Sequence, residues 1–201
     1  MKMVALSAPE RYADQEKRWF PPLTFLETEQ QRRLVHQLRD QAEQWVASKG
    51  LDQYEHGPHS KSEYAHADID RLFDAGQFVG RCVDNRIVAV VAITEPDPDF
   101  WTPAEMAEPQ GYLTRFLVAE HGKFHGQALL SAVETAEIRR GSKWLRLDVW
   151  RTNTKLHDYY LRQGFERVRT AVVPGRMSGE LFQMDLHRPG RVEVYPDSPR
   201  V

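Results

Sequence analysis

Six residues in the middle of the chain, KFHGQA from Lys123 to Ala128, have the composition of a phosphate-binding loop. They follow an apolar run, residues 112–118, whose β-branched and aromatic members predict a buried strand. Apolar residues then recur at helical spacing from Leu129 until Gly141. The first amides of a helix lack intrahelical acceptors and carry the positive end of its dipole. The pattern therefore indicates an anion site, with a lysine for charge and two small residues that let a diphosphate approach the backbone.

Taken alone, this loop is also compatible with an ordinary turn between a strand and a helix. It matches neither of the common nucleotide motifs, G-x-G-x-x-G and G-x-x-x-x-G-K-[ST]. A second unit of the same kind follows it. Residues 143–150 alternate like a strand, Asn153 begins a helix, and that helix ends at Gly164 before a further strand begins at Phe165.

Together the two units resemble the GNAT superfamily of acetyl-CoA-dependent N-acetyltransferases. The family's loop motif is [Q/R]-x-x-G-x-[G/A], and a later motif places Tyr seven residues after Asn, followed by Gly-Phe. Both spacings occur here, in residues 123–128 and in Asn153, Tyr160 and Gly164-Phe165. Lys123 replaces the usual Arg or Gln, which keeps the charge but loses the planar fork. Within the superfamily, the chain resembles an actinobacterial-type group in the segments Asp97 to Trp101, Trp144 to Asp148 and Ser178 to Gln183. The acceptors of that group are unassigned.

The resemblance implies an α/β (α+β) GNAT fold with a mixed central sheet of about six to seven strands. The sheet would be split between two central strands and flanked by about four helices. The GNAT domain would span residues 23–188, after an extended arm over 1–22 and before a mobile tail over 189–201. Elsewhere the patterns predict strands at 23–27, 78–83, 87–94, 166–173 and 179–187, helices from Thr28 to Lys49 and over 67–73, and a tight turn at Asp84-Asn85.

The cofactor implied by the resemblance is acetyl-CoA. By the family pattern, the backbone of Leu117 and Val118 would pair with the pantetheine arm, and the amides of residues 123–128 would hold the pyrophosphate. An amide near Phe116 would donate to the thioester carbonyl. Asn153 is expected to be a helix cap, a CoA contact or both. The expected cofactor contacts are Phe116, Leu117, Val118, Lys123, Phe124, His125, Gly126, Gln127, Ala128, Asn153 and Tyr160.

Two residues are the candidates for proton transfer. Tyr160 matches the tyrosine that GNAT enzymes use as general acid towards the CoA sulfur, and a phenol stays protonated at neutral pH. A core aromatic is the alternative interpretation. Asp148 lies where ribosomal-protein acetyltransferases of the superfamily have a glutamate base. L-D-V is also an ordinary strand sequence, and Glu95, Asp97 and Asp99 are rival carboxylates.

The proline-rich segment 95–103 carries acids and aromatic residues. It is a stiff connector or, by analogy with the family, the wall of an acceptor pocket that favours a cationic amine. The residues expected to bind the acceptor are Asp97, Asp99, Trp101, Arg115 and Trp150, although core packing or solvation also explains the last two.

Composition excludes several other classes of protein. The chain has 201 residues and a net charge of -2, which argues against a nucleic-acid surface. No apolar run approaches the roughly 20 residues of a membrane helix. The single cysteine, Cys82, allows no internal disulfide and no cysteine zinc site, and a cytoplasmic location is the default. His56, His59 and His66 lack acidic or thiol partners at ligand spacing, so we expect no metal.

The sequence therefore predicts an enzyme that acetylates a primary amine of a small molecule. Two alternatives stay open: acetylation of a protein N-terminus or lysine, and a GNAT module that binds acyl-CoA without turnover. A homodimer is compatible with the sequence.

Overall fold

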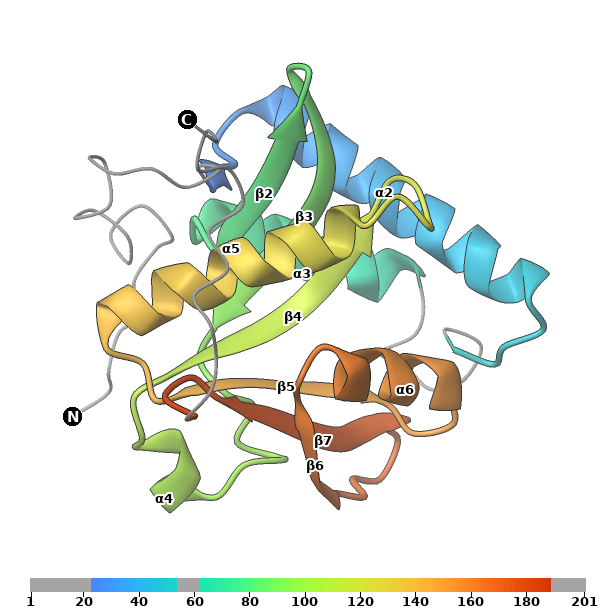
Figure 1. Ribbon diagram of the computed structural model, residues 1–201. Coiled ribbons are helices and arrows are strands. Elements are labelled where there is room, and N and C mark those ends of the chain that lie inside the picture. Colours follow the sequence, from blue (N-terminus) through green and yellow to red (C-terminus); the bar gives the residue numbers. More distant parts are fainter. Residues whose placement is uncertain (1–22, 54–61, 189–201) are drawn as a thin grey trace.

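The computed structural model describes residues 23–53 and 62–188 (Figure 1). The arm expected over residues 1–22, the tail expected over 189–201, and His56 and His59 lie outside the described residues.

A seven-stranded mixed sheet with the order β1-β2-β3-β4-β5-β7-β6 forms the middle of the molecule (Figure 1). All neighbouring strands are antiparallel except β4 and β5, which are parallel. This arrangement confirms the predicted mixed sheet. The strands are β1 Thr24–Phe25, β2 Phe78–Val83, β3 Arg86–Thr94, β4 Gln110–Val118, β5 Trp144–Trp150, β6 Glu166–Thr170 and β7 Ser178–Asp185.

The described residues form five helices: α2 Glu29–Ser48, α3 Ser62–Asp74, α4 Pro103–Met106, α5 His125–Arg140 and α6 Thr154–Arg162. Figure 1 shows α5 and α6 on the same side of the sheet. Their apolar residues share one core with β2 to β5 and β7, whereas α2 and α3 pack on the other face of β2 to β4 in a second core. None of these helices is long and apolar enough to cross a membrane.

Local sequence signals account for most element ends. Thr28 caps α2 in a capping box with Gln31. Asp84 and Asn85 both adopt left-handed φ values, 48° and 59°, as a two-residue hairpin turn requires. The strand predicted to reach Val173 ends earlier, at Thr170. The chain turns at Pro174, and a proline has no amide hydrogen with which to continue a strand ladder.

The sheet splits where β4 and β5 part. The two strands pair over four residues each, from Gln110 with Trp144 to Leu113 with Leu147. Beyond that point β4 stays on β3 alone, and the two strands diverge visibly (Figure 1). A β-bulge in β4 accompanies the split: the chain advances three residues from Thr114 to Leu117 while β3 advances two, from Val90 to Ala92. Arg115 lies within this bulge and has a φ of 50°.

Two arginines, Arg146 and Arg169, bind the connector between β3 and β4 to the sheet. The buried Arg146 donates to the Glu105 carbonyl at 2.6 Å and to Gln110 at 3.0 Å. Arg169 pairs with the Glu105 carboxylate at 2.6 Å and lowers its pKa to about 2. Both guanidiniums lie near the Trp101 ring, 4.8 Å from its centroid for Arg146 and 5.5 Å for Arg169. The short helix α4, which the sequence analysis did not predict, is fixed by these contacts.

A glycine in β4 allows α5 to pack closely. A Cβ at Gly111 would lie 2.8 Å from Cδ of Glu137, a fully buried residue whose carboxylate accepts from Ser142 and Arg140. We expect Gly111→Ala to lower the free energy of unfolding by roughly 1–3 kcal/mol in denaturant titrations, because the glutamate cannot move without losing these partners. In a Glu137→Ala background the cost should be much smaller. An equal cost in both backgrounds would contradict this explanation.

Candidate active site

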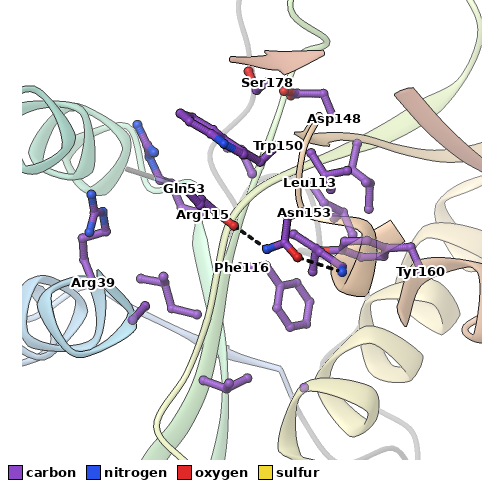
Figure 2. A pocket seen from close by; sticks show the side chains of 18 of the residues that line it. Arg39, Gln53, Leu113, Arg115, Phe116, Asp148, Trp150, Asn153, Tyr160 and Ser178 are labelled. Carbon is purple, nitrogen blue, oxygen red and sulfur yellow. Dashed lines mark hydrogen bonds between the residues drawn. The ribbon is translucent and has the colours of Figure 1, made fainter. Parts of the chain in front are cut away.

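A cavity of about 1210 Å³ runs through the split between β4 and β5. Its walls come from the start of α5, from α6, from α2 and α3, and from the connector after β3 (Figure 2). Most of the residues predicted from the sequence line it: Asp97, Arg115, Phe116, Leu117, Val118, Phe124, His125, Gly126, Gln127, Asp148, Trp150, Asn153 and Tyr160. Four predicted residues do not line it: Asp99, Trp101, Lys123 and Ala128.

The structure does not support Asp99 and Trp101 as parts of the acceptor wall. Trp101 is 2% exposed and packs in a buried cluster with Phe100, Tyr112 and Leu181, beside the two arginines described above. Asp99 is not among the lining residues, and its carboxylate lies 3.3 Å from Arg176, which does line the cavity. Both aromatic residues of this connector, Phe100 and Trp101, are buried and pack within the protein.

The glycine loop ends in a helix start that faces the cavity. α5 begins at His125, earlier than the predicted Leu129, because Phe124 turns the chain with a left-handed φ of 58°. Phe124 gives the helix no side-chain cap, so the amides of His125, Gly126 and Gln127 keep their positive ends for an anion. Lys123 lies on the exposed side of the loop, so the backbone carries more of the anion site than the lysine.

Gly126 is tightly packed, so a side chain there would require its neighbours to shift. A Cβ there would lie 3.1 Å from Cγ1 of Val118, 3.3 Å from Cε1 of Phe116 and 3.4 Å from the Tyr159 hydroxyl. This contact sets the first turn of α5 directly against the end of β4 and against α6. The cradle fits the pyrophosphate of CoA, which needs close approach to backbone amides.

Asn153 caps α6 and binds the opposite wall. Its Oδ1 accepts from the Leu156 amide at 3.1 Å, and its Nδ2 donates to Gln53 at 2.7 Å (Figure 2). The helix cap alone is sufficient to explain an asparagine at position 153, without a contact to the cofactor.

Tyr160 is both a core residue and a cavity residue. It is 6% exposed and packs at 5.4 Å from the Phe165 ring and 6.2 Å from the Phe182 ring. It also borders the cavity from α6 (Figure 2). The two interpretations of this tyrosine from the sequence are thus compatible with each other.

Asp148 lies on the other face of β5. Leu147 and Val149 point into the core under α5 and α6, and side chains alternate along a strand, so Asp148 points away from that core. The hydroxyl of Tyr112 donates to its Oδ1 at 2.5 Å, and Ser178 also donates to it. Burial raises the pKa of Asp148 above its ordinary value. Neither Tyr112 nor Ser178 was predicted, because the register of a parallel strand pair cannot be inferred from a local pattern.

The rival carboxylates differ from Asp148 in their partners. Asp97 pairs with Arg176 at 2.7 Å, and Asp99 faces the same guanidinium. Within the described part of the chain, Asp148 forms no ion pair at contact distance. Of these three carboxylates, Asp148 is the one without an arginine at contact distance among the described residues, and the third rival, Glu95, also lines the cavity.

A bridge of polar contacts crosses the cavity from the segment between α2 and α3, about 100 residues away in sequence. Asp52 accepts from Trp150 Nε1 at 3.3 Å and from the Thr152 hydroxyl at 2.6 Å. The contact between Gln53 and Asn153 completes this bridge. We call these five residues the Asp52–Gln53 bridge: Asp52, Gln53, Trp150, Thr152 and Asn153.

Two further predicted residues have partners in the helix pair. Arg115, at the bulge, binds Asp68 of α3 at 2.8 Å. His66 binds Asp40 at 2.7 Å and stacks on His36. Residues 23–53 and 62–188 contain no cluster of His, Cys, Asp and Glu that could hold a metal ion.

We expect Gly126→Ala to weaken CoA binding at least about tenfold, which corresponds to about 1.4 kcal/mol, because the added methyl group pushes the first turn of α5 off β4. Isothermal titration calorimetry measures this change. Ser131→Ala, a small change in the same helix outside the cavity, is the matched control and should bind CoA normally. Normal CoA affinity in Gly126→Ala would contradict the assignment of the cradle.

The chain is similar to proteins of one family. A model of the acetyltransferase (GNAT) family matches residues 37–165. A GNAT-family acetyltransferase from Listeria monocytogenes is 18% identical with a TM-score of 0.65, covering 82% of this chain and 94% of that one. A GNAT-family acetyltransferase from Streptococcus agalactiae is 14% identical with a TM-score of 0.63, covering 82% of this chain and 94% of that one.

The PaiA N-acetyltransferase of Thermoplasma acidophilum, solved in complex with coenzyme A, is 16% identical with a TM-score of 0.54, covering 82% of this chain and 98% of that one. No curated protein sequence is significantly similar. These structures share the fold, and the family model matches well over half of the sequence. The chain therefore belongs to the GNAT acetyltransferase family and is an acetyl-CoA-dependent N-acetyltransferase.

Proposed function

We propose that this enzyme acetylates the primary amine of a small molecule by direct transfer. Acetyl-CoA, when bound, supplies an acetyl group activated as a thioester. Asp148 takes the proton from the acceptor's ammonium, directly or through a water molecule, so that the amine becomes a nucleophile. Tyr160 gives a proton to the departing sulfur, and the bulge near Phe116 offers a backbone amide for the carbonyl oxygen.

The observation that carries this proposal is the placement of Asp148 and Tyr160 on opposite faces of β5, on either side of one split. A donor held by α5 and α6 approaches from the face of Tyr160. An acceptor approaches from the face of Asp148, where α2, α3 and the connector surround the cavity. The proposed acid, Tyr160, thus lies on the side of the donor, and the proposed base, Asp148, lies on the side of the acceptor.

The Asp52–Gln53 bridge favours a small acceptor over a polypeptide. An extended peptide needs an open groove along the acceptor face, whereas these side chains join the α2–α3 segment to α6 across it. Acetylation of a protein N-terminus or lysine is the alternative that an open groove would favour.

The charges near the split support a cationic acceptor. Arg176 pairs with Asp97 and Asp99, whereas Asp148 accepts hydrogen bonds from Tyr112 and Ser178 and has no ion pair of its own in the part of the chain that the structure describes. A positively charged amine would restore the balance on binding. A cytoplasmic location and a homodimer stay predictions from the sequence.

Thiol release from acetyl-CoA over a panel of small amines, aminoglycosides and peptides tests the proposal. We expect turnover with small amines and none with peptides. Tyr160→Phe and Asp148→Asn should each lower kcat by about 10² or more, the usual size of a general acid or base effect, with the Kd of CoA unchanged. Asp99→Asn, which removes an exposed carboxylate outside the cavity, is the control.

Each alternative gives its own result. Turnover confined to peptides would support a protein acetyltransferase, and CoA binding without turnover on any amine would support a non-catalytic module. Unchanged kcat in both variants would remove the proposed acid and base.

A further inference from the structure

We propose that Tyr112 is a positioning residue, whose hydroxyl holds the Asp148 carboxylate in one orientation at the acceptor side of the split. The inference rests on the proposed role of Asp148 as the base. Tyr112 lines the cavity wall but is only 3% exposed, and its hydroxyl is bonded to the carboxylate, so we assign its effect on the acceptor to Asp148.

Strand register brings the two side chains together. Tyr112 of β4 pairs with Arg146 of β5, and Asp148 is two residues further along β5 on the same face. Tyr112 lies one residue before the last paired position, Leu113 with Leu147. The phenol therefore reaches from the closed part of the sheet towards its open part, and the hydroxyl ends 2.5 Å from Oδ1 of Asp148.

The Tyr112 ring is held from behind. It packs edge-on against Trp101, with 6.3 Å between centroids and an interplanar angle of 84°. Trp101 in turn makes cation–π contacts with Arg146 and Arg169, both of which bind Glu105. The packing of Tyr112 against Trp101 thus fixes the position of the hydroxyl that binds the Asp148 carboxylate.

The charged and polar groups that act on Asp148 come from four other segments of the chain. Tyr112 of β4 and Ser178 of β7 donate to the carboxylate, and Arg176 from the loop before β7 attracts it. Asp97 of the connector repels it, and burial is the largest influence on its pKa and raises it. The two hydrogen bonds and the arginine oppose that rise, so the removal of the Tyr112 hydroxyl should raise the pKa of Asp148 further.

This sign leads to a specific change in pH dependence. A base acts in its ionised form, so activity falls as the pH drops through the pKa of Asp148. In Tyr112→Phe the acid limb of kcat/KM should move to higher pH by roughly one to two units, the size expected for loss of a hydrogen bond to a charged group. A tyrosine with only a packing role would change activity or stability without moving this limb.

The experiment measures kcat/KM against pH for the wild type, Tyr112→Phe and Ser178→Ala, and the Asp148 carboxyl titration by carbon NMR in the CoA-free protein. We expect a larger upward shift in Tyr112→Phe than in Ser178→Ala, whose hydroxyl can rotate. A second variant replaces Tyr112 by difluorotyrosine, a stronger donor of the same shape, and should shift both readouts to lower pH. It remains informative if Tyr112→Phe folds poorly.

Unchanged pH profiles and carboxyl titrations in folded Tyr112 variants would overturn the inference. The NMR titration requires no turnover, so it separates this inference from the proposed function. If Asp148→Asn retained full activity while the Tyr112 variants shifted the Asp148 titration, the base assignment would fail and the contact between the two residues would stand.

Discussion

The parting of two parallel strands controls the rest of this structure. β4 and β5 pair over only four residues, and the bulge at Arg115 accompanies their separation. A sheet of unbroken pairs would separate its two faces completely, because backbone hydrogen bonds close every gap between strands. The split leaves β4 with backbone groups that face the cavity, and it gives a substrate on one face access to a substrate on the other.

The two faces differ in chemistry because different elements cover them. α5 and α6 cover one face with a helix start, a closely packed glycine and Tyr160, which suit an anionic donor with a leaving thiolate. α2, α3 and the connector cover the other face with carboxylates and the Asp52–Gln53 bridge. Burial of Asp148 raises its pKa, and a buried carboxylate without an ion pair costs stability, which is a common feature of active sites.

Features set by neighbouring residues could be predicted from the sequence, whereas features set by distant contacts could not. The hairpin at Asp84-Asn85 and the caps at Thr28 and Asn153 depend on a few adjacent residues, and the motif spacing indicated the family correctly. By analogy with the family, the segment that carries Trp101 is expected to form either the acceptor wall or a stiff connector. The burial of Trp101 depends on Arg146 and Arg169, which lie more than 40 residues away. The contacts of Asp52 and Tyr112 likewise required the assembled sheet.

The central claim is that donor and acceptor meet inside the split, and a crystal structure with a bisubstrate analogue, CoA joined through an acetyl linker to an amine, tests it most directly. The account predicts that the pyrophosphate lies on the amides at the start of α5 and that the linker passes between β4 and β5. The sulfur should lie on the side of Tyr160 and the amine nitrogen on the side of Asp148. A linker outside the split, or both ends of the analogue on one face of β5, would contradict the account.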